Sequence, residues 1–324
     1  MQEVIWYFLG AFAIALLTSP LILYVLRKLK AGQEILSYVD FHNQKRGTPT
    51  MGGIIFILPM VILAPIFLRI SSPFAIVAVA ASLGYGILGF LDDYIKVRTK
   101  NNQGLRAYQK IIGQGGIAIL VAVFYTMANP DGRVLVPFFN VFLDLGWWIA
   151  PLVFVILIAT TNSVNLTDGI DGLASTVSLI YFAFVGVLIY LVADFANIPD
   201  QRELYLIIAI TTGALLCFLM FNSNRAKTFM GDTGSLYLGG LVATVSIFSF
   251  MSIFILVLGV MFVLSSLTVI IQVAYFKYTG GKRVFLMTPF HHHLEKRNWG
   301  EARIVALYGA VTVVAGLCLV LALL

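Results

Sequence analysis

The stretch VIWYFLGAFAIALLTSPLILYVL, residues 4–26, determines the class of fold to which the chain belongs. It is apolar almost throughout, and a helix needs about 20 such residues to cross the hydrocarbon core of a bilayer. The stretch is followed by Arg27, Lys28 and Lys30 rather than by the small residues of a signal-peptide cleavage site. It therefore predicts a first transmembrane helix and not a cleavable signal peptide.

Apolar segments of the same kind recur along the whole chain. Of its 324 residues, 60% are hydrophobic and 11% are charged, whereas soluble domains are about 45–50% apolar and about 25% charged. A soluble protein could not bury so much apolar surface. We predict an all-α polytopic membrane protein with a single integral membrane domain, residues 1–324. The ten expected transmembrane helices are 4–26, 52–69, 73–91, 111–128, 146–161, 173–193, 204–221, 235–250, 252–275 and 304–324.

The basic residues orient these ten helices. Of the 21 Lys and Arg, all but Arg69, Arg133 and Arg202 fall in five alternate loops. Because Lys and Arg are enriched in cytoplasmic loops, these five are expected to be cytoplasmic and both termini periplasmic. The net charge of +6 then reflects topology, and no nucleic-acid partner is expected. The five loops are 27–51, 92–110, 162–172, 222–234 and 276–303.

Two further patterns receive structural interpretations. The periplasmic segment 129–145 has Asp-Gly turn chemistry between short apolar runs, which predicts a small hairpin. Cys217 and Cys318 lie inside apolar runs and are expected to be unpaired.

Five aspartates adjoin helix ends on the predicted cytoplasmic side. Asp92 and Asp93 end the third span, Asp168 and Asp171 lie in TNSVNLTDGIDGLA, and Asp232 lies in FMGDTGSLYLGG. Each taken alone has a structural interpretation, as a turn residue or a helix N-cap. Together they would repel one another unless a cation joined them, and carboxylate oxygens suit Mg²⁺ or Mn²⁺ better than zinc.

Lysines near these acids complete a set of groups suited to phosphoryl transfer. Lys45, Lys96 and Lys110 are close to them in sequence and could bind phosphate. Catalysis of phosphoryl transfer consists mostly of positioning and charge neutralisation, which carboxylates, a metal ion and lysines supply.

A polar series runs from the fifth span into the loop that follows it. Asn162, Asn165, Asp168 and Asp171 recur every third residue, and neighbours at that spacing share a helix face. We expect a polar loop whose successive side chains line one pocket. A structural turn between two spans is the alternative.

The residues His291, His292 and His293 form an unbroken run. Zinc binding is one interpretation, but consecutive residues rarely direct three rings at one ion, and the chain has no HExxH pattern. Contacts to an anionic substrate are favoured instead.

The glycines at 84, 86 and 89 spell GxGxxG, but inside an apolar span rather than at a strand-to-helix turn. Close helix packing is expected there, and not dinucleotide binding.

Five segments together resemble the phospho-N-acetylmuramoyl-pentapeptide transferase family, the bacterial lipid I synthases. They are KRGTPTMGG, GFLDDYIKV, TNSVNLTDGIDGLA, FMGDTGSLYLGG and TPFHHHLE, in the family's order, and the resemblance covers essentially the whole chain. Ser163 and Tyr237 stand where alanine is expected, which leaves the charged positions unchanged. The resemblance implies Mg²⁺-dependent transfer of phospho-MurNAc-pentapeptide from its UDP carrier to undecaprenyl phosphate, with release of UMP. It also implies a homodimer in the bacterial cytoplasmic membrane, with its active site on the cytoplasmic face.

The resemblance further implies roles for particular residues. Asp232 is expected to bind Mg²⁺, with Asp92 and Asp93 as the catalytic acidic pair. The implied nucleotide and substrate positions are Lys45, Asn165, Asp168, Asp171, Asn222, Phe229 and Gln272. The residues expected to flank the phosphates and sugar are Lys96, Lys110, His291, His292 and His293. His291 is also a catalytic candidate.

The chemistry of the acceptor bears on the role of Asp92. A phosphate monoester has a second pKa of about 6, so the lipid phosphate is mostly ionised at neutral pH and gains little from a general base. We expect direct attack on the sugar-linked phosphorus, with Asp92 organising charge or metal, and a base role for Asp92 remains open.

Two other functions share some of these sequence features. A sister polyprenyl-phosphate N-acetylhexosamine-1-phosphate transferase would share the carboxylate loops. However, the long basic loop 277–303 with its histidines suits a peptide-bearing sugar better. An ion-coupled transporter would place ionisable groups near the membrane midplane, whereas the acids here map to one face.

Overall fold

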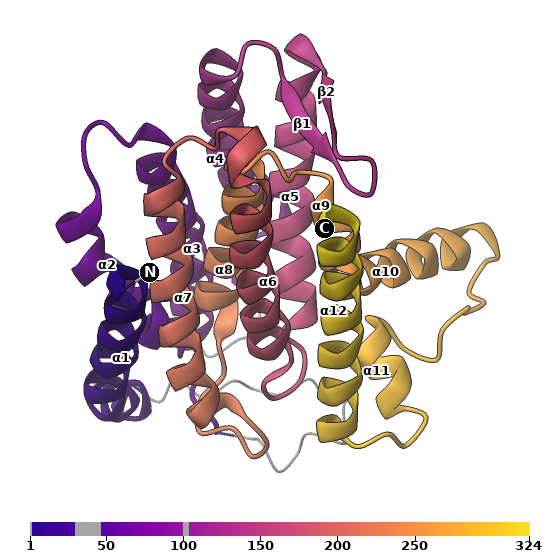
Figure 1. Cartoon of the computed structure of the whole chain (residues 1–324). Coiled ribbons are helices and arrows are strands. Elements are labelled where there is room, and N and C mark those ends of the chain that lie inside the picture. Colours follow the sequence, from indigo (N-terminus) through magenta and orange to yellow (C-terminus); the bar gives the residue numbers. More distant parts are fainter. Residues whose placement is uncertain (1, 30–46, 100–103) are drawn as a thin grey trace.

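The computed structural model describes residues 2–29, 47–99 and 104–324, and helices dominate it (Figure 1). The first helices are α1 (Gln2–Lys28), α2 (Ile54–Phe67), α3 (Pro73–Thr99) and α4 (Ala107–Ala128). After two short strands come α5 (Ile149–Thr167), α6 (Leu173–Ala196), α7 (Gln201–Asn222) and α8 (Gly231–Phe248). The chain ends with α9 (Phe254–Leu258), α10 (Val260–Tyr278), α11 (Phe290–Glu295) and α12 (Glu301–Leu323).

Eight of these helices are long and apolar enough to cross a membrane: α1, α3, α4, α5 (with the turn before it), α6, α7, α10 and α12. The shorter apolar α2 and the less apolar α8 account for the other two expected spans. The prediction of an all-α polytopic membrane protein is therefore confirmed. Both cysteines are unpaired, as expected.

The predicted span 252–275 is not one continuous helix. It is divided at Gly259 into α9 and α10, and α10 projects sideways from the bundle (Figure 1). A Cβ at Gly259 would lie 2.6 Å from the carbonyl oxygen of Ile255. A residue with a side chain would therefore clash at this break, and glycine avoids the clash.

Helix α8 occupies the centre of the bundle. Every residue from Thr233 to Phe248 is buried, and the most extensive contacts of α8 are with α3 and α5. Because α8 faces protein rather than lipid, it can contain glycine, serine and threonine where an outer span could not. Small residues of this kind let helix backbones approach closely in a membrane.

The glycines of α3 are part of this close packing. A Cβ at Gly89 would lie 2.0 Å from the backbone oxygen of Asp232, and one at Gly86 would lie 3.3 Å from Cβ of Tyr237. The packing role predicted for these glycines is confirmed. Since Gly89 lies one turn before Asp93, the same contact brings the acidic end of α3 against the start of α8.

The predicted hairpin is also confirmed. Strands β1 (Arg133–Val136) and β2 (Val141–Asp144) pair antiparallel at one end of the bundle (Figure 1). Asn140 in the turn donates a hydrogen bond to the backbone oxygen of Ala322, near the end of α12. The chain's end and the hairpin therefore lie together.

The N-terminal end of α1 lies at the same end of the bundle. Glu3 in the first turn of α1 forms an ion pair with Arg202 at the start of α7. Asp200, just before α7, accepts hydrogen bonds from the backbone N–H groups of Phe74 and Ala75 at the start of α3. The opposite end of the bundle, where α3 and α5 finish and α4 and α8 begin, carries the candidate site.

Candidate functional site

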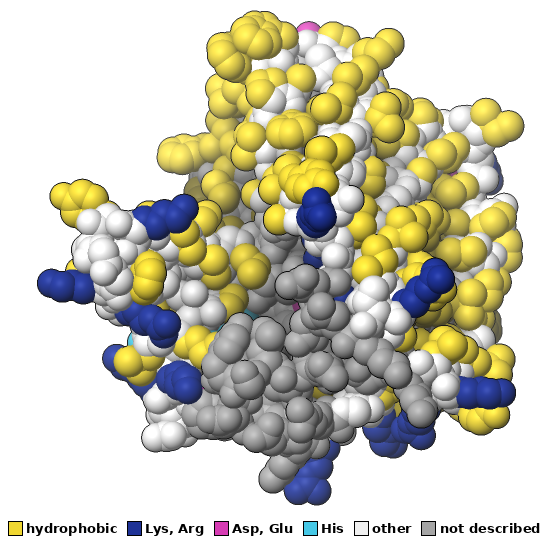
Figure 2. All heavy atoms as spheres, turned by 180° about the vertical axis from the view of Figure 1, so that it is seen from behind, with side chains coloured by type: hydrophobic (Ala, Val, Ile, Leu, Met, Phe, Trp, Pro, Cys, Tyr) yellow, Lys and Arg dark blue, Asp and Glu magenta, His cyan; other side chains and the backbone are white. Residues whose placement is uncertain are grey.

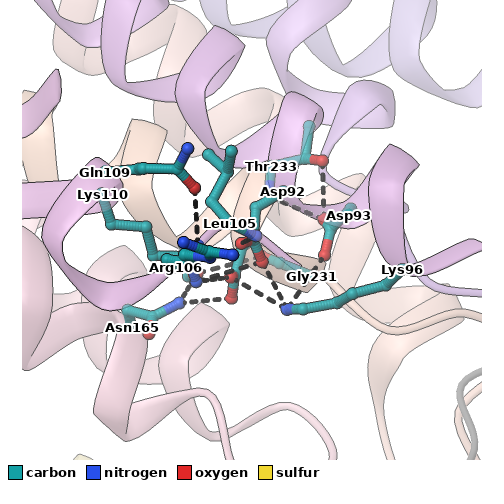
Figure 3. A network of polar contacts seen from close by, with 12 residues as sticks. Asp92, Asp93, Lys96, Leu105, Arg106, Gln109, Lys110, Asn165, Gly231 and Thr233 are labelled. Atoms are coloured by element: carbon teal, nitrogen blue, oxygen red, sulfur yellow. Dashed lines mark hydrogen bonds and ion pairs between the residues drawn. The ribbon is translucent and has the colours of Figure 1, made fainter. Parts of the chain in front are cut away.

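Three aspartates, Asp92, Asp93 and Asp232, meet at the junction of α3 and α8. Figure 3 shows Asp92 and Asp93 within the network of polar contacts there. Asp92 and Asp93 lie in the C-terminal half of α3, where they are 0% and 2% exposed, and Asp232 lies in the first turn of α8. Each offers a carboxylate oxygen within 4.8 Å of the others. The sequence predicted that these acids would gather, and the structure brings them together.

Each carboxylate has one oxygen held by a hydrogen bond from the protein. Asp93 Oδ2 accepts from the backbone N–H of Thr233 at 2.9 Å and from its hydroxyl at 2.7 Å. Asp92 Oδ1 accepts from the backbone N–H of Leu105 at 2.7 Å. Asp232 Oδ1 accepts from the side-chain amide of Asn165 at 2.8 Å. The fold thus orients the three carboxylates through these hydrogen bonds.

The other oxygen of each carboxylate faces a lysine. Lys96 Nζ lies 2.5 Å from Asp92 Oδ2, 3.1 Å from Asp232 Oδ2 and 3.9 Å from Asp93 Oδ1. Lys110 Nζ lies 3.0 Å from Asp92 Oδ2 and 2.6 Å from Asp232 Oδ2. Three carboxylates thus face two ammonium groups, and negative charge remains in excess.

This arrangement fits a divalent cation. The ammonium of Lys96 already lies among the three carboxylate oxygens that face the lysines, and Mg²⁺ and Mn²⁺ prefer oxygen ligands of this kind. Among residues 2–29, 47–99 and 104–324, these aspartates form the one group of three or more ligating side chains placed to share an ion. Asp92, Asp93 and Asp232 could therefore hold the metal, and Lys96 and Lys110 could then bind phosphate instead of the carboxylates.

Asp168 adds a fourth acidic group beside this cluster. It follows the last residue of α5 and accepts a hydrogen bond from the backbone N–H of Gly231. Burial raises the pKa of the Asp168 carboxyl well above its usual range, and repulsion from Asp232, Asp93 and Asp171 raises it further. Gly231 begins α8 with a φ of +72°, a conformation that glycine adopts readily.

Two of the expected substrate-binding residues hold a loop in place. Asp171 Oδ2 accepts from the backbone N–H of Ala226 at 2.9 Å, and the side-chain amide of Asn222 donates to the backbone oxygen of Thr228 at 3.1 Å. Both contacts fix the segment 223–228 between α7 and α8. In this structure these side chains shape the loop that leads to Phe229.

Phe229 is half-buried at the end of that loop. Its backbone N–H donates to the backbone oxygen of Pro49 at 2.8 Å, and its own backbone oxygen accepts from Gly52 at 2.8 Å. The segment before α2 therefore lies against this loop. Lys45, which precedes that segment in sequence, is outside the described residues.

Gln272 and His293 hold the loop between α10 and α11. Gln272 Oε1 accepts from the backbone N–H groups of Val284 at 3.1 Å and Phe285 at 2.9 Å. His293 Nδ1 accepts from the backbone N–H of Leu286 at 3.1 Å. Burial, and then the charge of Arg297, lower the pKa of the His293 ring, which favours the neutral form that this bond requires.

The three histidines do not share one environment. His291 is fully buried, and a Cβ at Gly169 would lie 2.1 Å from its Nε2, so its ring packs against the loop after α5. His292 pairs with Glu295 at 2.5 Å, while His293 stacks on Phe290 with ring centroids 5.9 Å apart. The rings of His291 and His292 lie with centroids 4.3 Å apart, so the three side chains are neighbours that contact different partners.

Sequence reasoning missed several residues that orient the acids. Thr233 directly follows Asp232, and its proximity to Asp93 depends on how α3 meets α8. The Leu105 contact is made by a backbone amide, which leaves no signal in the sequence. Ser235, which accepts a hydrogen bond from Asn165 at 2.7 Å, lies one turn along α8.

Comparison with known proteins first defines the class. Residues 75–250 match the model of glycosyl transferase family 4. This range contains the three aspartates, both lysines and the segment 223–229. The chain is thus a membrane protein of the glycosyl transferase class, and the transporter interpretation is discarded.

The particular family follows from a shorter signature and from whole-chain relatives. Residues 45–57 match signature 1 of phospho-N-acetylmuramoyl-pentapeptide-transferase. Proteins of that name from Listeria monocytogenes serotype 4b and Clostridium kluyveri are both 42% identical to the chain, over 97% and 99% of its length and 97% and 98% of theirs. A relative of the same name from Clostridium novyi is 39% identical over 99% of the chain and 96% of its own length. The chain belongs to the phospho-N-acetylmuramoyl-pentapeptide transferase family, which confirms the resemblance.

Proposed function

We propose that the protein transfers phospho-MurNAc-pentapeptide from UDP-MurNAc-pentapeptide to undecaprenyl phosphate, giving lipid I and UMP for peptidoglycan synthesis. The observation that carries the proposal is the cluster of Asp92, Asp93 and Asp232 with Lys96 and Lys110, in a chain 42% identical to transferases of that name. The cluster lies at an end of the helical bundle, where a soluble nucleotide and a membrane-anchored acceptor can both reach it.

The main difficulty of the reaction is to bring one phosphate anion against another. Asp232, with Asp92 and Asp93, would hold Mg²⁺, which supplies positive charge to the phosphate oxygens. The ammonium groups of Lys96 and Lys110 lie beside Oδ2 of Asp92 and of Asp232. From this position, next to the proposed metal site, they would bind oxygens of the diphosphate and of the acceptor. Asn165 would keep Asp232 in the required orientation.

Asp92 orients charge in this mechanism and does not remove a proton. Its Oδ1 is held by the N–H of Leu105, and its Oδ2 contacts both lysines. The acceptor phosphate has a second pKa of about 6 and is already mostly ionised at neutral pH. The test is the dependence of kcat on pH for the wild type and for Asp92→Asn. If the profile of Asp92→Asn lacks an ionisation that the wild-type profile shows, while KM for the acceptor is unchanged, Asp92 is instead a general base.

The loop 223–229 would bind the nucleotide end of the donor. Asp171 and Asn222 fix this loop and leave Phe229 half-buried at its end, which suits stacking on uracil. Lys45 belongs to the same proposed site. If Phe229 only fills space between helices, Phe229→Leu should leave KM for the UDP-sugar unchanged; stacking predicts an increase corresponding to about 1–3 kcal/mol.

The loop 277–303 would recognise the muramoyl-pentapeptide. Gln272 and His293 hold this loop against the end of α10, and His291 joins it to the loop after α5. His292 would contact the sugar or peptide from the same helix. Helix α10, which projects sideways from the bundle, leads into this loop (Figure 1).

The protein is proposed to lie in the bacterial cytoplasmic membrane as a homodimer, with the site facing the cytoplasm. Figure 2 shows Lys and Arg side chains gathered toward the end of the molecule that carries the site, while hydrophobic side chains cover the other end. Single cysteines at Asn224 and Asp131, in a cysteine-free background, should label from opposite sides of the membrane. Labelling of both from the periplasm would contradict this orientation. Cross-linking in native membranes tests the dimer.

The activity is tested with the purified protein, UDP-MurNAc-pentapeptide and undecaprenyl phosphate. UMP release that requires the lipid acceptor, stops with a chelator and returns with Mg²⁺ is the expected result. UDP-GlcNAc should be used at least about a hundredfold less efficiently, which needs about 3 kcal/mol of differential recognition. Efficient use of UDP-GlcNAc would instead assign the chain to the sister reaction.

A further inference from the structure

A pair of amide side chains joins α4 to α5 about one helical turn from Lys110 and Asn165, which contact the acidic cluster. The side-chain amide of Asn162 donates to Gln114 Oε1 at 2.9 Å, and that of Gln114 faces Asn162 Oδ1 at 3.4 Å. The two side chains therefore bond reciprocally. Gln114 is 1% exposed, so it is out of reach of substrate.

The amide pair lies on the same two helices, α4 and α5, as Lys110 and Asn165. Gln114 lies four residues after Lys110 on α4, and Asn162 lies three residues before Asn165 on α5. Residues at these spacings share a helix face. Lys110 and Asn165 converge on the two oxygens of Asp232, at 2.6 Å and 2.8 Å. The amide pair is thus the next contact inward between the two helices that hold Asp232.

We propose that Gln114 and Asn162 are positioning residues, which fix the register of α4 against α5 so that Lys110 and Asn165 reach Asp232 together. This inference rests on the proposed transferase function and extends it to residues outside the site. A reciprocal amide pair suits this purpose because its hydrogen bonds are directional, whereas apolar side chains would tolerate sliding of one helix along the other. Both partners are also tied to the backbone around them. Asn162 donates to the oxygen of Ile158 at 2.8 Å, and the backbone oxygen of Gln114 accepts from the hydroxyl of Tyr85 at 3.3 Å.

The test replaces the pair in two ways. In Gln114→Leu/Asn162→Leu both partners become apolar, a change that leaves no unpaired polar group and can be nearly neutral for stability. In Gln114→Asn/Asn162→Gln the two residues exchange places, which keeps the combined side-chain length and the reciprocal bonding. UMP release from UDP-MurNAc-pentapeptide, as kcat and KM separately, and the thermal unfolding midpoint are measured for each variant and for the wild type.

The leucine variant should unfold near the wild-type temperature yet lose roughly tenfold or more in kcat, because displacements of about 1 Å at a reacting centre are costly. KM for the UDP-sugar should change much less, and the exchanged variant should recover most of kcat. Ser246→Ala is a matched control: it removes the buried bond to Tyr181, roughly 21 Å along α8 from Asp232, and should leave kcat unchanged.

Three results would overturn the proposal. They are a leucine variant with kcat within twofold of the wild type, a loss of kcat that follows only a loss of thermal stability, and an exchanged variant that folds but recovers no activity. If the leucine variant does not fold, Gln114→Met is judged by the same criteria. An inactive wild type would refute the transferase function itself, which separates the two failures.

Discussion

At the residue scale, Asp232 is the point at which most of the contacts of the site meet. Its Oδ2 contacts Lys96 and Lys110, and its Oδ1 accepts from Asn165. Asp232→Asn should preserve the fold but abolish turnover, and excess Mg²⁺ should restore little. A carboxylate ligand contributes several kcal/mol to the transition state, which corresponds to a loss of about a thousandfold or more.

The measurement for Asp232→Asn is UMP release across a Mg²⁺ titration. Asp131→Asn is the matched control, because Asp131 is an exposed residue at the hairpin end of the bundle. Near-normal turnover by a folded Asp232→Asn protein would remove Asp232 from the proposed metal site.

Asp168 leads to a prediction about pH. Its carboxyl has a raised pKa because of burial and neighbouring acids, so its ionised form destabilises the folded protein. That destabilisation is present above the raised pKa, decreases as the pH falls through it, and is absent below the unfolded value of about 3.9. Asp168→Asn should therefore raise the unfolding midpoint at pH 7.5, and the gain should shrink toward pH 4.

Thermal unfolding of both proteins without added metal, over pH 4–8, checks this expectation. Asn keeps an oxygen that can accept from Gly231, so the hydrogen bond itself need not be lost. A gain in stability that does not depend on pH would show that charge repulsion is not its cause.

At the scale of elements, the site depends on how closely α3 approaches α8. A Cβ at Gly89 would lie 2.0 Å from the backbone oxygen of Asp232, so Gly89→Ala must push the two helices apart. We expect a loss of about 1–3 kcal/mol of stability from overpacking. A drop in activity of roughly tenfold or more should accompany it, because the acids sit on both sides of this contact.

Gly84→Ala is the control within the same helix. A Cβ there would meet only the flexible end of Ile117, at 3.2 Å, so both activity and unfolding midpoint should stay close to the wild type. Equal effects of the two substitutions would contradict a specific role for the α3–α8 contact. Activity and thermal unfolding of the two variants decide the question.

At the scale of the whole molecule, the features that could be predicted from the sequence are those that depend on hydropathy, charge and turn residues. The outer transmembrane helices could be predicted from hydropathy, because each of them must be apolar on its own to face lipid. The clustering of Asp92, Asp93 and Asp232 could be predicted because like charges beside a membrane need a common partner. The hairpin at 129–145 followed from its turn residues.

Other features depend on tertiary contacts and leave no such signal. The break at Gly259 is flanked by apolar residues on both sides, so hydropathy shows one continuous span. The hydrogen bond from Leu105 to Asp92 comes from a backbone amide, which every residue type but proline supplies. Gln272 and His293 also hold the loop between α10 and α11 through hydrogen bonds to its backbone, contacts that sequence spacing could not predict.

The enclosure of α8 by its neighbours has a consequence for how the protein is made. Four glycines, an aspartate and four serine or threonine residues among its 18 residues give it little tendency to leave the insertion machinery for lipid on its own. Its partners α3 and α5 are synthesised earlier, so a protein-lined slot can already exist when α8 emerges from the ribosome. In an in vitro insertion assay with single segments, α7 should integrate into membranes efficiently and α8 poorly, and efficient integration of α8 alone would refute this order of assembly. The helix that carries Asp232 would then enter the bilayer after the helices that surround it.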